Sequence, residues 1–196
     1  MVKNKWGVEI MPERICAIDA STNSLAFATF HGGHLKEVGK IKFEGKDIYE
    51  KVIDAGRKSK GLFDHIVNVD AIVIEHTVFM NSPKTAADLA LVQGALLGAA
   101  GQAGIRVIGK VAPITWQNFI GNKKISKYEK LFIKSQNPGK SESWLKSHER
   151  ELRKQRTIRY INTIYDRTIT DNDVADACGI GHWAMSNWGK AIGVDK

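Results

Sequence analysis

Residues 15–28 read ICAIDASTNSLAFA, and this stretch decides the predicted fold. Apolar, β-favouring residues lie on both sides of the turn-forming cluster 21–24, a pattern typical of two strands joined by a tight turn. Asp19 stands at the end of the first of these strands, so its carboxylate is expected at the rim of a sheet. An Asp beside a turn often only hydrogen-bonds the nearby backbone. This position alone therefore leaves a functional and a structural interpretation open.

Strand and helix patterns alternate along the following part of the chain. The sequence predicts a third strand over 36–43, a helix over 47–67 and a nearly continuous apolar strand over 70–75. A helix over 85–101 and a strand over 105–108 follow, and parallel pairing of this strand with the preceding one would complete a βαβ unit. The order indicates an α/β domain with a mixed sheet.

Three further acids stand where an ordinary structural role is less convincing. Glu75 ends the apolar run AIVIE, and a carboxylate on a buried strand is costly unless it is paired or binds a metal. Asp173 and Asp176 are three residues apart in a predicted helix over 172–185, so both lie on one face of it. Two carboxylates held together repel each other unless a cation lies between them. Asp171 precedes the helix and is better interpreted as its cap, but it remains the alternative to Asp173 as a ligand.

Two strand ends and one helix can bring these four acids to a single site. Mg²⁺ takes oxygen ligands in octahedral geometry, and two such ions about 3.5–4 Å apart activate water for phosphodiester hydrolysis. The sequence therefore predicts a site for Mg²⁺ or Mn²⁺, with two ions, built from acids that are both catalytic and metal-binding: Asp19, Glu75, Asp173 and Asp176.

The 196 residues suit one domain, 43% of them are hydrophobic, and neither a signal peptide nor an apolar run long enough for a membrane span is recognisable. We therefore expect a single domain over 1–196 in a cytoplasmic compartment, with no membrane partner. Cys16 and Cys178 lie in apolar segments without metal-ligand spacing, which favours buried, reduced thiols over a disulfide.

The charge distribution points to a polyanion as partner. The net charge is +8, and residues 122–160 contain twelve Lys or Arg against four Glu, so the whole excess lies in that segment. Such density is a usual footprint of nucleic-acid binding, although a solvated helix face would look the same by composition. We expect a basic, mostly helical segment at about 122–167, broken at Asn137–Gly139.

Together these motifs resemble the RuvC family of Holliday junction resolvases, within the ribonuclease H-like superfamily. Residues 15–28 resemble the family's first hairpin, with Ser21 where Gly is usual. EHTVFMN at 75–81 resembles its metal-ligand strand and the loop that follows. ALVQGALLGAA at 90–100 resembles its central helix, and VAPITW at 111–116 its next strand exit. With the closing DVADA motif, the resemblance covers about 14–121 and 168–188, and leaves 122–167 weakly matched.

The resemblance implies a ribonuclease H-like mixed five-stranded sheet flanked by helices. It also implies a homodimer, with no nucleotide cofactor, that cuts four-way and other branched DNA in recombination and repair, in a bacterial cell or a phage-infected host cell. Phe79 matches an aromatic residue that stacks on a junction base, although its loop is one residue longer here. A plain core role is the alternative for this residue. The DNA-binding lysines are predicted to follow the sheet, and one of them to face the scissile phosphate: Lys110, Lys123, Lys124 and Lys127.

Three other functions remain to be separated from this one. A ribonuclease H or a transposase-like nuclease would use the same acids on another substrate. The actin-like ATPase fold has a similar first hairpin but needs two domains, for which 196 residues leave no room. A catalytically inactive DNA-binding relative would not need the full set of four acids.

Overall fold

The computed structural model describes residues 12–66, 68–76 and 82–194. Five strands form one sheet in the order β3-β2-β1-β4-β5. Their bounds are β1 (Arg14–Ala20), β2 (Ser24–His31), β3 (His34–Lys42), β4 (Ala71–Glu75) and β5 (Val107–Val111). The β1–β2 and β2–β3 pairs are antiparallel, whereas β1–β4 and β4–β5 are parallel. The predicted mixed five-stranded sheet is confirmed.

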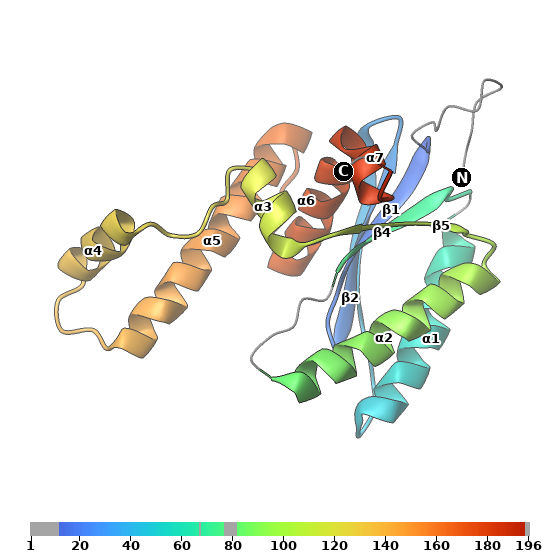
Figure 1. Ribbon diagram of the computed structural model, residues 1–196, viewed down its shortest axis with the longest axis horizontal. Coiled ribbons are helices and arrows are strands. Elements are labelled where there is room, and N and C mark those ends of the chain that lie inside the picture. Colours follow the sequence, from blue (N-terminus) through green and yellow to red (C-terminus); the bar gives the residue numbers. More distant parts are fainter. Residues whose placement is uncertain (1–11, 67, 77–81, 195–196) are drawn as a thin grey trace.

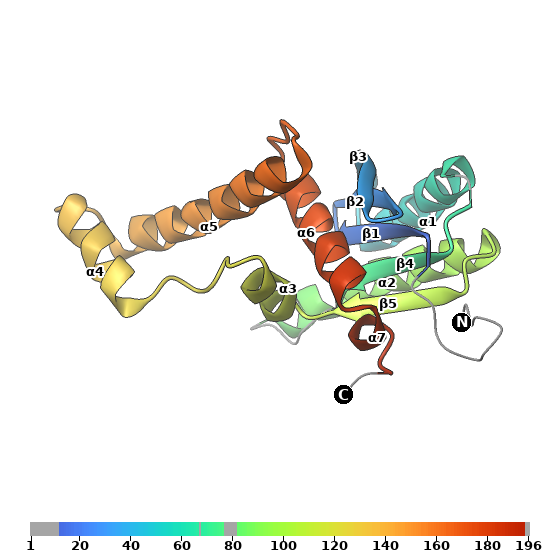
Figure 2. The same ribbon diagram turned by 90° about the horizontal axis from the view of Figure 1, so that it is seen from above.

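Helices cover both faces of this sheet (Figures 1 and 2). On one face lie α1 (Ile48–His65) and α2 (Pro83–Gln102), and on the other lies α6 (Asn172–Ser186). The remaining helices are α3 (Pro113–Phe119), α4 (Lys127–Gln136), α5 (Glu142–Tyr165) and α7 (Trp188–Ala191). No helix in the described part of the chain is both long and apolar enough to cross a membrane.

Alternation along β1 explains the two cores. Ile15 and Ala17 pack with α6, whereas Cys16 and Ile18 pack with α1 and α2, and all four are fully buried. Cys16 and Cys178 are both free and buried, as predicted.

Small residues let α6 approach the sheet closely. A Cβ on Gly179 would lie 2.6 Å from the Trp116 ring, and a Cβ on Gly181 would overlap the Phe30 ring. These two glycines therefore fix how deep α6 sits, and with it the position of the acids near the start of this helix.

The basic segment folds as an arm, which we define as α4, α5 and the residues that link α3 to α4. Figure 2 shows the arm extending away from the sheet, with α4 at its outer end and the C-terminal part of α5 beside α6. Ser126 and Glu129 form a capping box on α4, and Ser141 caps α5 after the predicted break. A small cluster of Ile125, Ile133 and Leu145 holds the outer end together.

Two details differ from the sequence prediction. The last strand spans Val107–Val111 rather than 105–108, because Gly104 turns the chain with a φ of +83° and Ile105 is still packed in the core. Lys110 therefore lies within β5 instead of after the sheet. The helix α3 was not predicted: Pro113 stands at its first turn, where the missing N–H costs no hydrogen bond.

Candidate active site

Strand register brings Asp19 and Glu75 together. Ile18 pairs with Ile74 across the parallel β1–β4 ladder, so the next residue of each strand, Asp19 and Glu75, reaches the same edge of the sheet. The first turns of α6 pass over this edge and add Asp173 and Asp176 from one helix face. The four acids predicted from sequence thus lie around the same edge of the sheet, within electrostatic reach of Asp19.

Asp19 is surrounded by the charges of the other three acids. Burial raises the pKa of its carboxyl well above the ordinary value, and the negative charges of Glu75, Asp176 and Asp173 raise it further. Lys40 acts in the opposite direction. Three acids that each disfavour ionisation of a fourth must lie within electrostatic reach of it.

Asp176 follows the same pattern. Burial, with the charges of Glu75 and Asp173, raises its pKa from 3.8 to about 7. A hydrogen bond from Thr157 and the nearby Lys154 offset part of this effect, and both come from α5 of the arm. The arm therefore contributes to the site directly.

Glu75 is held by an aromatic donor. The indole N–H of Trp116 donates a 2.6 Å hydrogen bond to Glu75 Oε2. Burial raises the pKa of Glu75, and this hydrogen bond partly counteracts the rise. Trp116 is not among the site residues predicted from sequence, and nothing in its spacing from Glu75 signals the contact.

A cation from the edge strand β3 also reaches the acids. Lys40 Nζ lies 2.5 Å from Asp173 Oδ2 and 3.0 Å from Asp171 Oδ2. Asp171 Oδ1 accepts hydrogen bonds from the backbone N–H groups of Asp173 and Val174, so its interpretation as the helix cap is confirmed. Lys40 was missed by sequence analysis because 131 residues separate it from Asp171.

These residues fit a divalent cation in donor type and in charge. Ionised carboxylates that lie near one another repel, and a cation relieves that repulsion. Among the described residues, no three His, Cys, Asp or Glu side chains stand together closely enough to hold an ion as they are. Ion binding would therefore require the carboxylates to draw together, and Asp173 to exchange its contact with Lys40.

The residues predicted to bind DNA lie in three places. Lys110 lines a cavity of about 270 Å³ with His76 and Lys190, next to the strand that carries Glu75. Lys123 and Lys124 are exposed in the link between α3 and α4, and Lys127 begins α4 at the outer end of the arm. Phe79 lies outside the described residues, so its stacking role stays a prediction.

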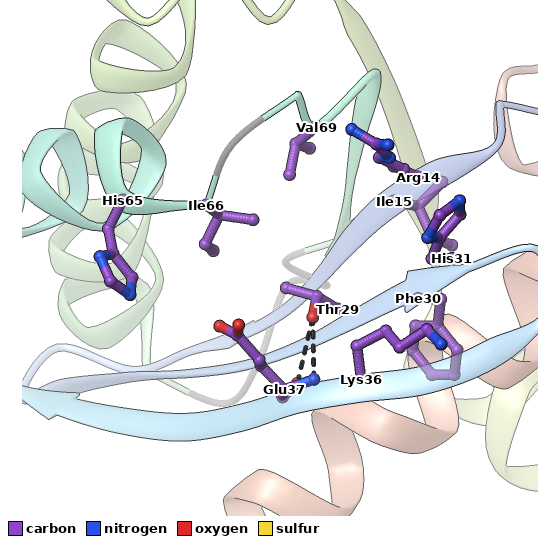
Figure 3. Close-up of a pocket in the computed structure, with 10 residues that line it drawn as sticks. All are labelled: Arg14, Ile15, Thr29, Phe30, His31, Lys36, Glu37, His65, Ile66 and Val69. Atoms are coloured by element: carbon purple, nitrogen blue, oxygen red, sulfur yellow. Dashed lines mark hydrogen bonds between the residues drawn. The ribbon is translucent and has the colours of Figure 1, made fainter.

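Another cavity, of about 290 Å³, lies at the other end of β1 (Figure 3). Arg14 and Ile15 open β1 and line this cavity, whereas Asp19 lies near the end of the strand. Thr29 and Glu37, joined by a hydrogen bond, form part of its wall. The cavity is therefore separate from the acids and takes no part in their chemistry.

Comparison with solved structures identifies the fold. Thermus thermophilus RuvC, in complex with a Holliday junction substrate, aligns with a TM-score of 0.65 over 92% of this chain and 99% of that chain. The chain has the RuvC fold. A second structure of the Thermus RuvC gives a TM-score of 0.60 over 89% of this chain and 96% of the other, and sequence identity is 14% in both.

The RuvC fold extends into the arm. A coverage of 92% leaves too few residues unaligned to account for the whole of 122–167, so part of this segment has a structural counterpart in the Thermus RuvC. No protein-family model matches the sequence. No curated protein matches it either.

Proposed function

We propose that this chain is a divalent-metal-dependent endonuclease that cleaves four-way DNA junctions. The observation that carries the proposal is the electrostatic coupling of Asp19 with Glu75, Asp173 and Asp176 on a RuvC fold. Asp19 and Asp176 have pKa values raised in part by the charges of neighbouring acids, which destabilises a protein unless the acids have a binding role, so their convergence favours a cation site.

Asp19, Glu75, Asp173 and Asp176 would hold the cations. Two bound divalent ions would supply an activated water and stabilise the leaving oxygen of the phosphodiester. Trp116 orients Glu75 through the indole N–H and keeps the oxygen that accepts this bond in a fixed place. Thr157 orients Asp176 in the same way from α5.

The Thermus RuvC structure with a Holliday junction suggests the substrate class. The basic arm would neutralise backbone phosphates, which supply most of the affinity of proteins for DNA. Resolution of a four-way junction needs two symmetric cuts, and a twofold homodimer provides two equivalent sites. We therefore propose a homodimer, which light scattering in the presence of junction DNA tests.

Cleavage of three labelled substrates tests the proposed function. The protein is incubated with a four-way junction, a linear duplex of the same sequence and an RNA–DNA hybrid, each with Mg²⁺, with Mn²⁺ or with a chelator. We expect paired nicks near the junction centre in the metal-containing reactions only. Flap and three-way substrates define whether other branched DNA is cut.

Two outcomes contradict the proposal. Preferential cutting of the hybrid would assign the same acids to a ribonuclease H-like activity. Junction binding without cleavage at any metal concentration would indicate a DNA-binding protein that has lost catalysis.

A further inference from the structure

A third cavity, of about 360 Å³, lies in the arm, between the link to α4, α4 itself and the first half of α5. Basic side chains dominate its lining. We name it the basic pocket, and its charged lining residues are Lys124, Lys130, Lys146, Glu149, Arg150 and Arg153.

Most of this positive charge is not neutralised by the protein. Lys130 pairs with Glu149 at 2.8 Å, which uses the one carboxylate of the lining. Among the described residues, Lys124, Lys146 and Arg150 form no ion pair, and Arg153 donates only to the neutral amide of Gln117 at 2.5 Å. Like charges gathered on a folded surface repel one another, so a bound anion would reduce the repulsion among the basic side chains of the pocket.

Arg153 adds an independent observation. Its Nε is buried and has no hydrogen-bond partner within the described structure. A buried guanidinium N–H without an acceptor is costly, and such groups call for an explanation. A bound anion at the pocket would balance the charge excess and provide an acceptor beside Arg153.

The pocket is built on a fixed framework. Asn122 is buried, and its side-chain amide donates to the Arg153 carbonyl and to the Thr157 hydroxyl, both at 2.9 Å. Thr157 in turn donates to Asp176 in the candidate active site. One short hydrogen-bonded path therefore fixes the pocket relative to the acids.

Helix geometry gives the separation of the two sites. Arg150 and Lys146 precede Thr157 on α5, which places them about 10 and 16 Å from it along the axis at about 1.5 Å per residue. Successive phosphates of one strand advance about 3.4 Å along a duplex axis. A DNA strand that runs along α5 from the acids would therefore bring a phosphate about three to five positions away to the pocket.

We propose that the basic pocket binds one backbone phosphate of a DNA arm, about three to five nucleotides from the cleaved bond. This rests on the proposed function, because it takes the strand at the acids as its reference. Because Asn122 and Thr157 link the pocket to Asp176, this contact would help to place one phosphodiester at the acids. The pocket's ligand chemistry is a phosphate monoanion, which a DNA backbone or a free phosphate could supply.

The test measures junction binding in a chelator, so that no cleavage is needed. Lys146→Gln/Arg150→Gln removes two pocket charges. Lys134→Gln/Lys140→Gln removes two charges from the same arm outside the pocket, where Lys134 pairs with Glu142 and Lys140 lies over the Trp144 ring. We expect the pocket variant to bind the junction about tenfold more weakly. The slope of the logarithm of its binding constant against the logarithm of the salt concentration should be smaller in magnitude by about 1. Both quantities should change much less in the control.

A neutral methylphosphonate, placed one position at a time along the junction arm, locates the contact. We expect one position within the stated range to weaken binding of the unmodified protein and to leave the pocket variant unaffected. Equal losses in the two double variants, or no position with this behaviour, would overturn the proposal. Cleavage of the junction by the unmodified protein in Mg²⁺ shows independently whether the proposed function holds.

Inorganic phosphate distinguishes the source of the ligand. Thermal unfolding is measured in phosphate at about 10 mM, a concentration high enough to occupy a weak anion site. The comparison is sodium chloride of equal ionic strength. We expect no difference between the two salts. Stabilisation of the unmodified protein by phosphate, absent in the pocket variant and accompanied by unchanged junction affinity, would make this a free-phosphate site and contradict the proposal.

Discussion

Lys40 Nζ lies 2.5 Å from Asp173 Oδ2, so a lysine side chain forms an ion pair with a residue that is predicted to bind a metal. Lys40 also lowers the pKa of Asp19, which links the edge strand to the acid at the centre of the site. The contact offsets part of the repulsion among the acids in the metal-free protein. The Lys40 ammonium group would also compete with a metal ion for the Asp173 carboxylate.

Replacement of Lys40 by Gln should separate these two effects. We expect the metal-free protein to unfold at a lower temperature at pH 7.5, because repulsion among the acids is no longer offset. Apparent Mg²⁺ affinity should rise about two- to fivefold, because the ion no longer has to break the ion pair of Lys40 with Asp173. A partly exposed ion pair contributes about 0.5–1 kcal/mol, which corresponds to this change in affinity. Calorimetric titration measures the affinity. Lys42→Gln, on the same strand, is the control, and identical behaviour of the two variants would contradict the role of Lys40.

Asp176→Asn should stabilise the protein while removing activity. The pKa of Asp176 is about 7 in the folded protein, above the ordinary 3.8, so folding favours the protonated carboxyl. The contribution of this group to stability is therefore complete below about pH 4 and is lost as the pH rises through about 7. The neutral amide should remove that loss and raise the Tm of the metal-free protein at pH 8 by a few degrees, since 1 kcal/mol shifts Tm by about 2–4 °C at this size.

The same variant should lose metal-dependent stabilisation and at least about 100-fold in cleavage rate. Asp64→Asn, which removes a surface carboxylate paired with Lys60, serves as the control. A lower Tm for Asp176→Asn at pH 8 than for the unmodified protein would contradict the electrostatic account of the site.

Trp116→Phe should shift the pH dependence of cleavage. The indole hydrogen bond lowers the pKa of Glu75, so its loss raises that pKa and moves the acidic limb of the pH–rate profile to higher pH. Stability should fall by about 1–3 kcal/mol because a fully buried ring is trimmed. Trp183→Phe trims another buried indole, one with no bond to an acid among the described residues, and should leave the profile in place.

Gly179→Ala and Gly181→Ala form a matched pair on α6. A Cβ on Gly179 meets the Trp116 ring and one on Gly181 meets the Phe30 ring, so both should destabilise the protein by about 1–3 kcal/mol. Only the Gly179 variant should also displace the pH–rate profile, since Trp116 carries the bond to Glu75. Equal profiles in both variants would show that Trp116 does not control Glu75.

Local patterns carry the parts of this fold that the sequence predicts. Period-two alternation and the turn at 21–24 indicate β1 and β2, and the run ending in Glu75 indicates a buried parallel strand. The sequence places Asp19 and Glu75 at strand ends, but their convergence depends on the parallel pairing of β1 with β4, which only the structure shows. The i, i+3 spacing places Asp173 and Asp176 on one face.

The partners of these acids are not predictable in the same way. Lys40 contacts Asp173 because α6 packs closely on the sheet, and Trp116 contacts Glu75 because α3 lies beside the end of β4. Both arrangements depend on contacts between segments that are distant in the sequence. Lys and Trp are also common in ordinary structural roles, so their residue type carries no signal. The basic segment was visible as charge, but its division into a packed inner end and an outer pocket depends on the buried contacts of Asn122 and Leu145.

Metal-dependent catalysis by the four acids is tested by the rate of strand cleavage in a labelled four-way junction, measured against Mg²⁺ concentration for the unmodified protein and Asp19→Asn. We expect saturable, metal-dependent cleavage by the unmodified protein, and junction binding without cleavage by the variant. Cleavage by Asp19→Asn at an undiminished rate, or cleavage by the unmodified protein in a chelator, would contradict this expectation.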